Sequence, residues 1–134
     1  MEGAGEPVRR LFSDRGSATV EFTLVAALLV LVVVSVMQLS LGLYVRNVVV
    51  DACGEGARYG ALLGGDGEAA AQRTRDLITR AVNSEYAGDV TVRYETINGI
   101  DTVVVTARTP IPVIGLLGVA EISAEGHGVL ETLD

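Results

Sequence analysis

The sequence lacks lysine and tryptophan altogether, and it has only one cysteine among its 134 residues. A disulfide needs two cysteines, so no bridge can form within the chain. All ten cationic side chains are arginines, and they are dispersed rather than gathered in a basic run. We therefore expect no binding to nucleic acid, and we ascribe the absence of lysine to compositional bias.

Reactive side chains are too few and too scattered to predict an active site. The one histidine, His127, lies between two glycines near the C-terminus, far along the chain from Cys53. No metal-ligand spacing occurs, and no nucleophile elbow, P-loop or dinucleotide-binding fingerprint is present. We expect no enzymatic activity, no cofactor, no metal and no small-molecule substrate.

Cys53 has two interpretations. It could form an intermolecular disulfide between two copies of the chain, or it could be a small apolar residue on one face of a helix. Free cysteine behaves as a small hydrophobic residue, so the second interpretation is the more common. The sequence favours it.

Charge is concentrated behind residue 45. The formal net charge of the chain is −7, and residues 46–134 hold seven Arg against thirteen Asp and Glu. These residues are numerous enough for one modest hydrophobic core. We expect one small acidic domain there.

Apolar residues are most abundant from Phe22 to Val45, which is 24 residues without a charge. As an α-helix this run would be roughly 36 Å long, enough to cross the hydrocarbon core of a bilayer. A helix in the core of a soluble protein would carry polar residues at helical spacing, and a removable signal peptide would be shorter. Tyr44 stands at the far end, where interfacial aromatic residues are common. The run predicts a single transmembrane helix.

Arginines on the two sides of this span predict its orientation. Arg9, Arg10 and Arg15 precede the span, whereas Arg46 and Arg58 follow it. Because positive residues favour the cytoplasmic side, the N-terminal stub is expected in the cytoplasm and the domain outside it.

The junction before the span has two unusual features, Gly16 after an arginine and Glu21 at the mouth of the apolar run. In one interpretation Gly16 belongs to a linker, and the helix macrodipole favours Glu21 by about 0.3–1 kcal/mol. In the other, a membrane protease cuts between Gly16 and Ser17. The new amino group of Ser17 in an axially shifted copy would then pair with Glu21, which is otherwise costly in lipid.

The segment RGSATVEF, Arg15 to Phe22, together with the segment EGAR, Glu55 to Arg58, resembles the TadE-like minor pilins, or pseudopilins. These belong to the tight-adherence (Tad, or Flp) type IV pilus system. The resemblance covers roughly residues 15–63. Glu-Phe in place of the Glu-Tyr of major Flp pilins, and the long region behind the span, point to a minor component.

This resemblance implies cleavage after Gly16, before Ser17, by a prepilin peptidase. It also implies a role in subunit assembly for the Glu21-Phe22 pair. The implied partners are the lipid bilayer, the peptidase, other pilin or pseudopilin subunits and the pilus assembly platform.

Small residues recur every four positions behind the span, at Ala52, Gly56 and Gly60. Each glycine costs about 1 kcal/mol relative to alanine inside a helix. We expect this face to admit close approach by another helix, in the same subunit or in a partner. The alternative is a broken helix in this stretch.

The remaining residues predict a small α+β domain. Gly64 to Gly67 break the first helix, and an amphipathic helix is expected from about Glu68 to Ala87. Asn98-Gly99 is a strong hairpin signal between two alternating segments. The expected strands are Asp89–Ile97, Thr102–Thr109 ended by Pro110 and Pro112, and Glu121–Glu131. The apolar segment Ile111–Ala120 is expected to be a loop that covers the sheet edge or binds a partner.

Three regions are therefore expected: a cleaved cytoplasmic leader (1–16), a long helix (17–63, span about 22–45) and an extracytoplasmic α+β domain (64–134). The domain would hold the second helix and an antiparallel sheet of about three strands. The predicted function is a minor pilin-like subunit for assembly of a tight-adherence pilus or related secretion apparatus, anchored in the cytoplasmic membrane. The alternative is an uncleaved single-pass envelope protein whose outer domain is a protein-binding scaffold.

Overall fold

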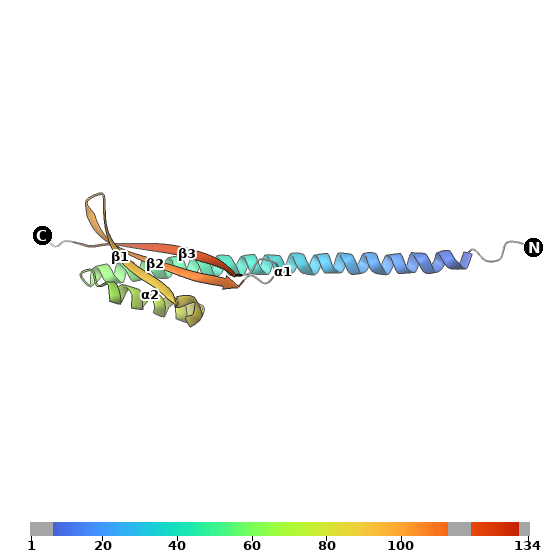
Figure 1. The fold of residues 1–134 in the computed structure, drawn as a ribbon, viewed down its shortest axis with the longest axis horizontal. Helices are drawn as coiled ribbons and strands as arrows, with labels where there is room; N and C mark the ends of the chain where they lie inside the picture. The colour runs from blue at the N-terminus through green and yellow to red at the C-terminus, as the bar shows by residue number, and fades with distance from the viewer. Residues whose placement is uncertain (1–6, 113–118, 132–134) are drawn as a thin grey trace, which may run out of the picture. The chain divides into compact units, whose positions relative to one another are not determined.

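The computed structural model describes residues 7–112 and 119–131. Its elements are helices α1 (Pro7–Leu62) and α2 (Gly67–Ala81), a short 3-10 helix η1 (Ser84–Ala87), and strands β1 (Asp89–Ile97), β2 (Ile100–Pro112) and β3 (Val119–Val129) (Figure 1). The α+β class, the long N-terminal helix, the second helix and the three-stranded antiparallel sheet are as predicted.

The chain divides into two compact units, residues 1–39 and 40–134. Helix α1 belongs to both. Among the described residues α1 alone is long and apolar enough to cross a membrane, and none of its most apolar stretch is buried. The predicted span is therefore a helix whose apolar side chains have no protein cover within the described part of its unit.

Polar side chains within the apolar part of α1 are bonded to the helix itself. The hydroxyl groups of Thr23 and Ser35 donate to the carbonyl oxygens of Thr19 and Leu31, at 2.9 and 2.7 Å. Because each hydroxyl has a partner one turn back, these residues add little cost to an apolar environment. Helix α1 begins at Pro7, earlier than the segment 17–63 expected for it, and proline is favourable in a first helical turn.

Helix α2 starts at a side-chain cap. The carboxylate of Asp66 accepts a hydrogen bond from the amide of Ala69 at 3.0 Å, which satisfies one of the free amides at the helix N-terminus. The turn before it uses Gly64 and Gly65, whose φ angles of 75° and 87° suit glycine.

The prediction that this second helix reaches Ala87 was wrong, because α2 ends at Ala81. Val82 leaves the helical region with φ −128° and ψ −81°, and Asn83 is extended. Both residue types form helices poorly. The 3-10 helix that follows is held to the sheet by Thr109, whose hydroxyl donates to the carbonyl of Tyr86 at 2.9 Å.

The sheet has the order β1-β2-β3, with every neighbouring pair antiparallel. Strands β1 and β2 pair from Asp89↔Arg108 to Ile97↔Ile100. The two residues between them, Asn98 and Gly99, have φ angles of 53° and 82°. Positive φ at both positions is what a two-residue type I′ turn requires.

Proline does not end the middle strand, contrary to the prediction, since β2 continues through Pro110 to Pro112. The register explains this. The ladder between β1 and β2 ends at the Asp89↔Arg108 pair, where β1 begins. Pro110 therefore has a strand neighbour only on the β3 side, at Glu121. A residue without an N–H group is tolerated at such an edge. The predicted loop Ile111–Ala120 is strand at both ends, and its residues 113–118 lie outside the described residues.

One face of the sheet packs against both helices to form the core. Alanine and valine dominate its buried side chains, which come from α1 (Val45, Val49, Cys53, Ala57, Ala61), α2 (Ala70, Ala71, Ile78) and the strands (Val90, Val103, Val105, Ala107, Ala124). Such small side chains let the layers approach closely. In Figure 1 the strands run alongside the C-terminal part of α1.

Two glycines of β3 provide the closest approach between sheet and helix. A Cβ atom at Gly126 would overlap the backbone of Cys53 and Gly54, and one at Gly128 would overlap the backbone of Ala57. Glycine inside a strand usually weakens it. The structure shows that these two glycines allow β3 to lie directly on the α1 backbone.

Candidate functional site

The junction between leader and span is exposed on the surface of α1. Residues 14–21 are all exposed, and a Cβ atom added at Gly16 would meet nothing within 4 Å. No other part of the described chain covers the peptide bond between Gly16 and Ser17.

Ser17 and Glu21 lie on one side of the helix, one turn apart. The Ser17 hydroxyl donates to Oε1 of Glu21 at 3.4 Å, and the hydroxyl of Thr19 donates to the carbonyl of Arg15 at 3.0 Å. The first of these bonds is long and exposed, hence weak. The Glu21 carboxylate is therefore available to a stronger, charged partner.

Glu21 also marks a sharp change in the chemistry of the helix surface. The next residue, Phe22, is 75% exposed, and large apolar side chains follow it on all sides of the helix. A helix that is apolar all round requires lipid or other apolar helices as its surroundings. Glu21 and Phe22 thus stand together at the polar end of this surface.

The small-residue positions behind the span lie against α2 of the same chain. A Cβ atom at Gly60 would be 2.5 Å from the Ala70 Cβ, and one at Gly56 would be 2.8 Å from the Ala70 carbonyl oxygen. Ala52 is buried beside them, and its carbonyl oxygen accepts a hydrogen bond from Thr74 at 3.3 Å. Of the two partners that the sequence left open, the structure places one, a helix of the same subunit. Helix α1 runs unbroken through this stretch.

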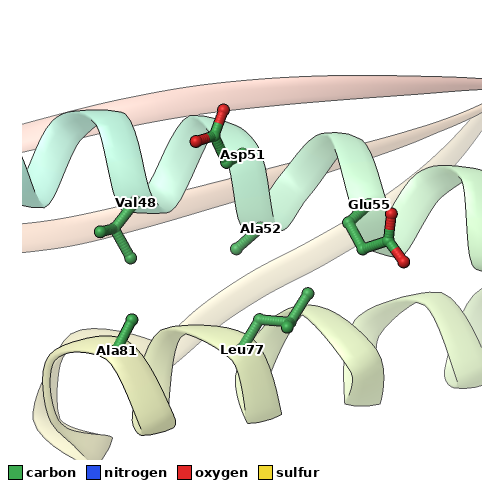
Figure 2. Close-up of a pocket in the computed structure, with 6 residues that line it drawn as sticks. All are labelled: Val48, Asp51, Ala52, Glu55, Leu77 and Ala81. Carbon is green, nitrogen blue, oxygen red and sulfur yellow. The ribbon is translucent and has the colours of Figure 1, made fainter.

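A groove of about 300 Å³ lies between α1 and α2 (Figure 2). Val48 and Ala52 of α1 face Leu77 and Ala81 of α2 across it. Acidic residues of α1 also line this groove, at Asp51 and Glu55. Apart from these two carboxylates the groove is lined by apolar side chains, as is usual where two helices pack together.

Glu55 is held by α2. Nη2 of Arg73 lies 3.5 Å from the Glu55 carboxylate, and the same guanidinium stands 5.7 Å from the ring centroid of Tyr59. These contacts join α2 to the EGAR segment of α1. Both partners of the ion pair are partly exposed, so its stabilising contribution is modest.

The solvent face of the sheet carries a polar cluster that the sequence pattern did not reveal. Arg93 of β1 lies 2.6 Å from Glu95 and 3.0 Å from Glu125 of β3. The Arg93–Glu125 ion pair thus spans β2, the strand between them. Hydrogen bonding to Arg93 lowers the pKa of Glu125. Beneath this bridge Val104 is fully buried. The pairing depends on strand register, which spacing along the chain does not show.

Cys53 is completely buried between α1 and the sheet, with its Sγ 3.7 Å from the carbonyl oxygen of Ala124. Burial raises the pKa of its thiol to about 11. An intermolecular disulfide needs an accessible thiolate. The structure thus supports the interpretation of Cys53 as a small apolar core residue. In the described part of the chain no group of three or more His, Cys, Asp or Glu residues is placed to hold a metal ion.

One of three comparisons with known proteins found a match, and it lies within α1. No curated protein matches the chain, and no solved structure does. The model of one protein family, described as TadE-like protein, matches residues 16–58. The match begins at the junction glycine and ends with the EGAR segment, and it confirms the resemblance predicted from the sequence: residues 16–58 of this chain are similar to the TadE-like family.

Proposed function

We propose that the chain is a minor pilin-like subunit for assembly of a tight-adherence pilus or related secretion apparatus. The observation that carries the proposal is the exposed Gly16–Ser17 bond, placed five residues before Glu21 opens a helix that is apolar on all sides. The match of residues 16–58 to the TadE-like family supports it. The chain itself has no catalytic role in this proposal.

Processing takes place at the junction. A prepilin peptidase activates a water molecule, which adds to the Gly16 carbonyl carbon, and the bond to the Ser17 nitrogen breaks. The leader leaves with a new carboxylate on Gly16, and Ser17 keeps the nitrogen as its α-amino group. In a helix this carbonyl is hydrogen-bonded to the amide four residues later, so the junction has to unwind locally. Glycine lowers that cost by about 1 kcal/mol relative to alanine.

Glu21 then acts in assembly. Its carboxylate accepts a long hydrogen bond from Ser17, at 3.4 Å, and lies at the edge of the apolar surface. The α-amino group of Ser17 in an axially shifted copy gives it a charged partner. A carboxylate in lipid is costly unless it is paired, so this pairing favours one register between stacked helices.

Until assembly the same helix anchors the protein in the cytoplasmic membrane, with the leader inside and the domain behind the span outside. Two features limit the span. Glu21 is charged at one end, and at the other end Val45 is already buried in the domain, at 1% exposure. Phe22 to Tyr44 lie between them, and the first twenty of these residues, Phe22 to Leu41, would already cover about 30 Å, the thickness of the hydrocarbon core.

A substitution of Glu21 tests the assembly step. Glu21→Gln keeps the size of the side chain and removes its charge, whereas Asp14→Asn makes the same change in the leader. We expect both variants to be cleaved and inserted, and only Glu21→Gln to be lost from sheared pilus fractions. Normal incorporation of Glu21→Gln would overturn the pairing role of Glu21.

A further inference from the structure

We propose that the end of the sheet formed by Ile111 of β2 and Ala120 of β3 lies in the interface of the bilayer, as a second lipid contact of this chain. The inference rests on the proposed insertion of α1 in the membrane. It adds to that insertion a defined surface of the domain and a defined partner, the lipid interface.

Ile111 of β2 lies beside Gly42 of α1. Ile111 pairs with Ala120 at the end of the β2–β3 ladder. A Cβ atom added at Gly42 would lie 4.0 Å from Cδ1 of Ile111. The end of the sheet is therefore level with Gly42, the residue directly after the stretch Phe22–Leu41.

The domain packs on α1 from this level onward, with no linker between span and domain. The hydroxyl of Tyr44 donates to the carbonyl of Ala81 at 3.2 Å, which joins α1 to the end of α2. Val45 is buried in the core one residue later. Because these contacts begin within one helical turn of Leu41, the domain cannot move away from the membrane without losing them.

The depth of the interface decides whether Ile111 reaches it. The headgroup region adds about 5–7 Å to each side of the hydrocarbon core. One helical turn covers about 5.4 Å, so a residue beside Gly42 lies within this region. The interface accepts apolar side chains and proline readily.

The chemistry of this end of the sheet suits that environment. No charged residue occurs between Arg108 and Glu121 in the sequence. The side chains described there are Thr109, which is buried, Pro110 and Ala120, which are exposed, and Ile111, which is partly buried. The opposite end of the sheet also exposes an apolar residue, Ile100 at 50%, but it stands beside Asp101.

Fluorescence of single tryptophans tests the proposal, because the chain has none of its own. We would place tryptophan in the full-length chain at Ala120, at Ile111, at Val30 within the span, and at Ile100 in the opposite turn. Ala120 is exposed, so Ala120→Trp removes no packing. Each variant is reconstituted in phosphatidylcholine–phosphatidylglycerol vesicles whose acyl chains carry bromine near the headgroup, in vesicles whose acyl chains carry it near the chain end, and in matched unbrominated vesicles.

We expect bromine near the headgroup to quench Ala120→Trp and Ile111→Trp and to leave Ile100→Trp unchanged. The emission of Ala120→Trp and Ile111→Trp should also be shifted to the blue in all vesicles. Val30→Trp reports on the span itself, through bromine near the chain end. Loss of quenching at Val30 would overturn the insertion of α1, and the inference with it. Quenching at Val30 with none at Ala120 and Ile111 would overturn this inference alone.

Discussion

The hydroxyl group of Thr74 in α2 lies 2.9 Å from the carbonyl oxygen of Ala70 and 3.3 Å from that of Ala52 in α1. Thr74 is fully buried, so its side chain joins the two helices at the centre of their contact. Thr74→Val keeps the shape and removes the donor. We expect a loss of about 0.5–1.5 kcal/mol in the free energy of unfolding, measured with urea in detergent.

Thr91→Val is the control for this change, because Thr91 is exposed on the solvent face of β1. It is expected to change the free energy of unfolding by no more than about 0.5 kcal/mol. Equal stability of Thr74→Val and the unchanged chain would show that the hydroxyl contributes nothing to the helix contact.

Two glycines of α1 that are two positions apart are expected to respond in opposite directions to alanine. A Cβ atom at Gly56 would overlap the Thr74 side chain, whereas one at Gly54 would meet nothing within 4 Å. Gly56→Ala is expected to destabilise the domain by about 1–3 kcal/mol through overpacking. Gly54→Ala is expected to stabilise it by up to about 1 kcal/mol, because alanine favours the helix. Thermal unfolding followed by circular dichroism distinguishes them, and a stabilised Gly56→Ala would contradict the close packing.

The Arg93–Glu125 pair predicts a small acid-dependent loss of stability. Arg93 lowers the pKa of Glu125 from its ordinary value of 4.5, so the folded state favours the ionised carboxylate. The resulting stabilisation is present above pH 4.5 and is lost as the pH falls through the lowered pKa. Glu125→Gln is expected to flatten this part of the pH profile of the urea midpoint. Identical profiles below pH 4.5 would contradict the interaction.

Cys53 is expected to react slowly in the folded chain. Its pKa is raised from 9.0 to about 11, which alone lowers the thiolate fraction near pH 8 about a hundredfold. Burial slows access further. Alkylation by iodoacetamide, measured by mass spectrometry, should therefore be fast only in denaturant. Fast alkylation of the folded protein would mean that Cys53 is accessible.

Local patterns in the sequence predicted the parts of the fold that depend on local chemistry. The uncharged run from Phe22 requires only length and composition, and Asn98-Gly99 requires only a turn. One error, at Pro110, and one unforeseen role, at Gly126, arose where a distant element decides the outcome. Whether Pro110 can stay in β2 depends on where the ladder with β1 ends, and the role of Gly126 depends on the α1 backbone beside it.

In the candidate site, too, the sequence predicted what neighbouring residues decide and missed what distant elements decide. Only four residues separate Gly16 from Glu21 on a single helix, so the sequence alone predicted them as a unit. Gly56 and Gly60 were recognisable as a packing face, but their partner α2 follows only from the structure. Arg93 and Glu125 were missed because three strands and their register bring them together.

The proposed function depends above all on removal of the leader after Gly16, which the mature N-terminus reveals. The protein is extracted from membranes of cells with an active prepilin peptidase and of cells without it, and its intact mass and N-terminal sequence are determined. The account predicts a chain that begins Ser17-Ala18-Thr19 in the first case and at Met1 in the second. A chain that begins at Met1 in both would contradict the claim and favour an uncleaved envelope scaffold.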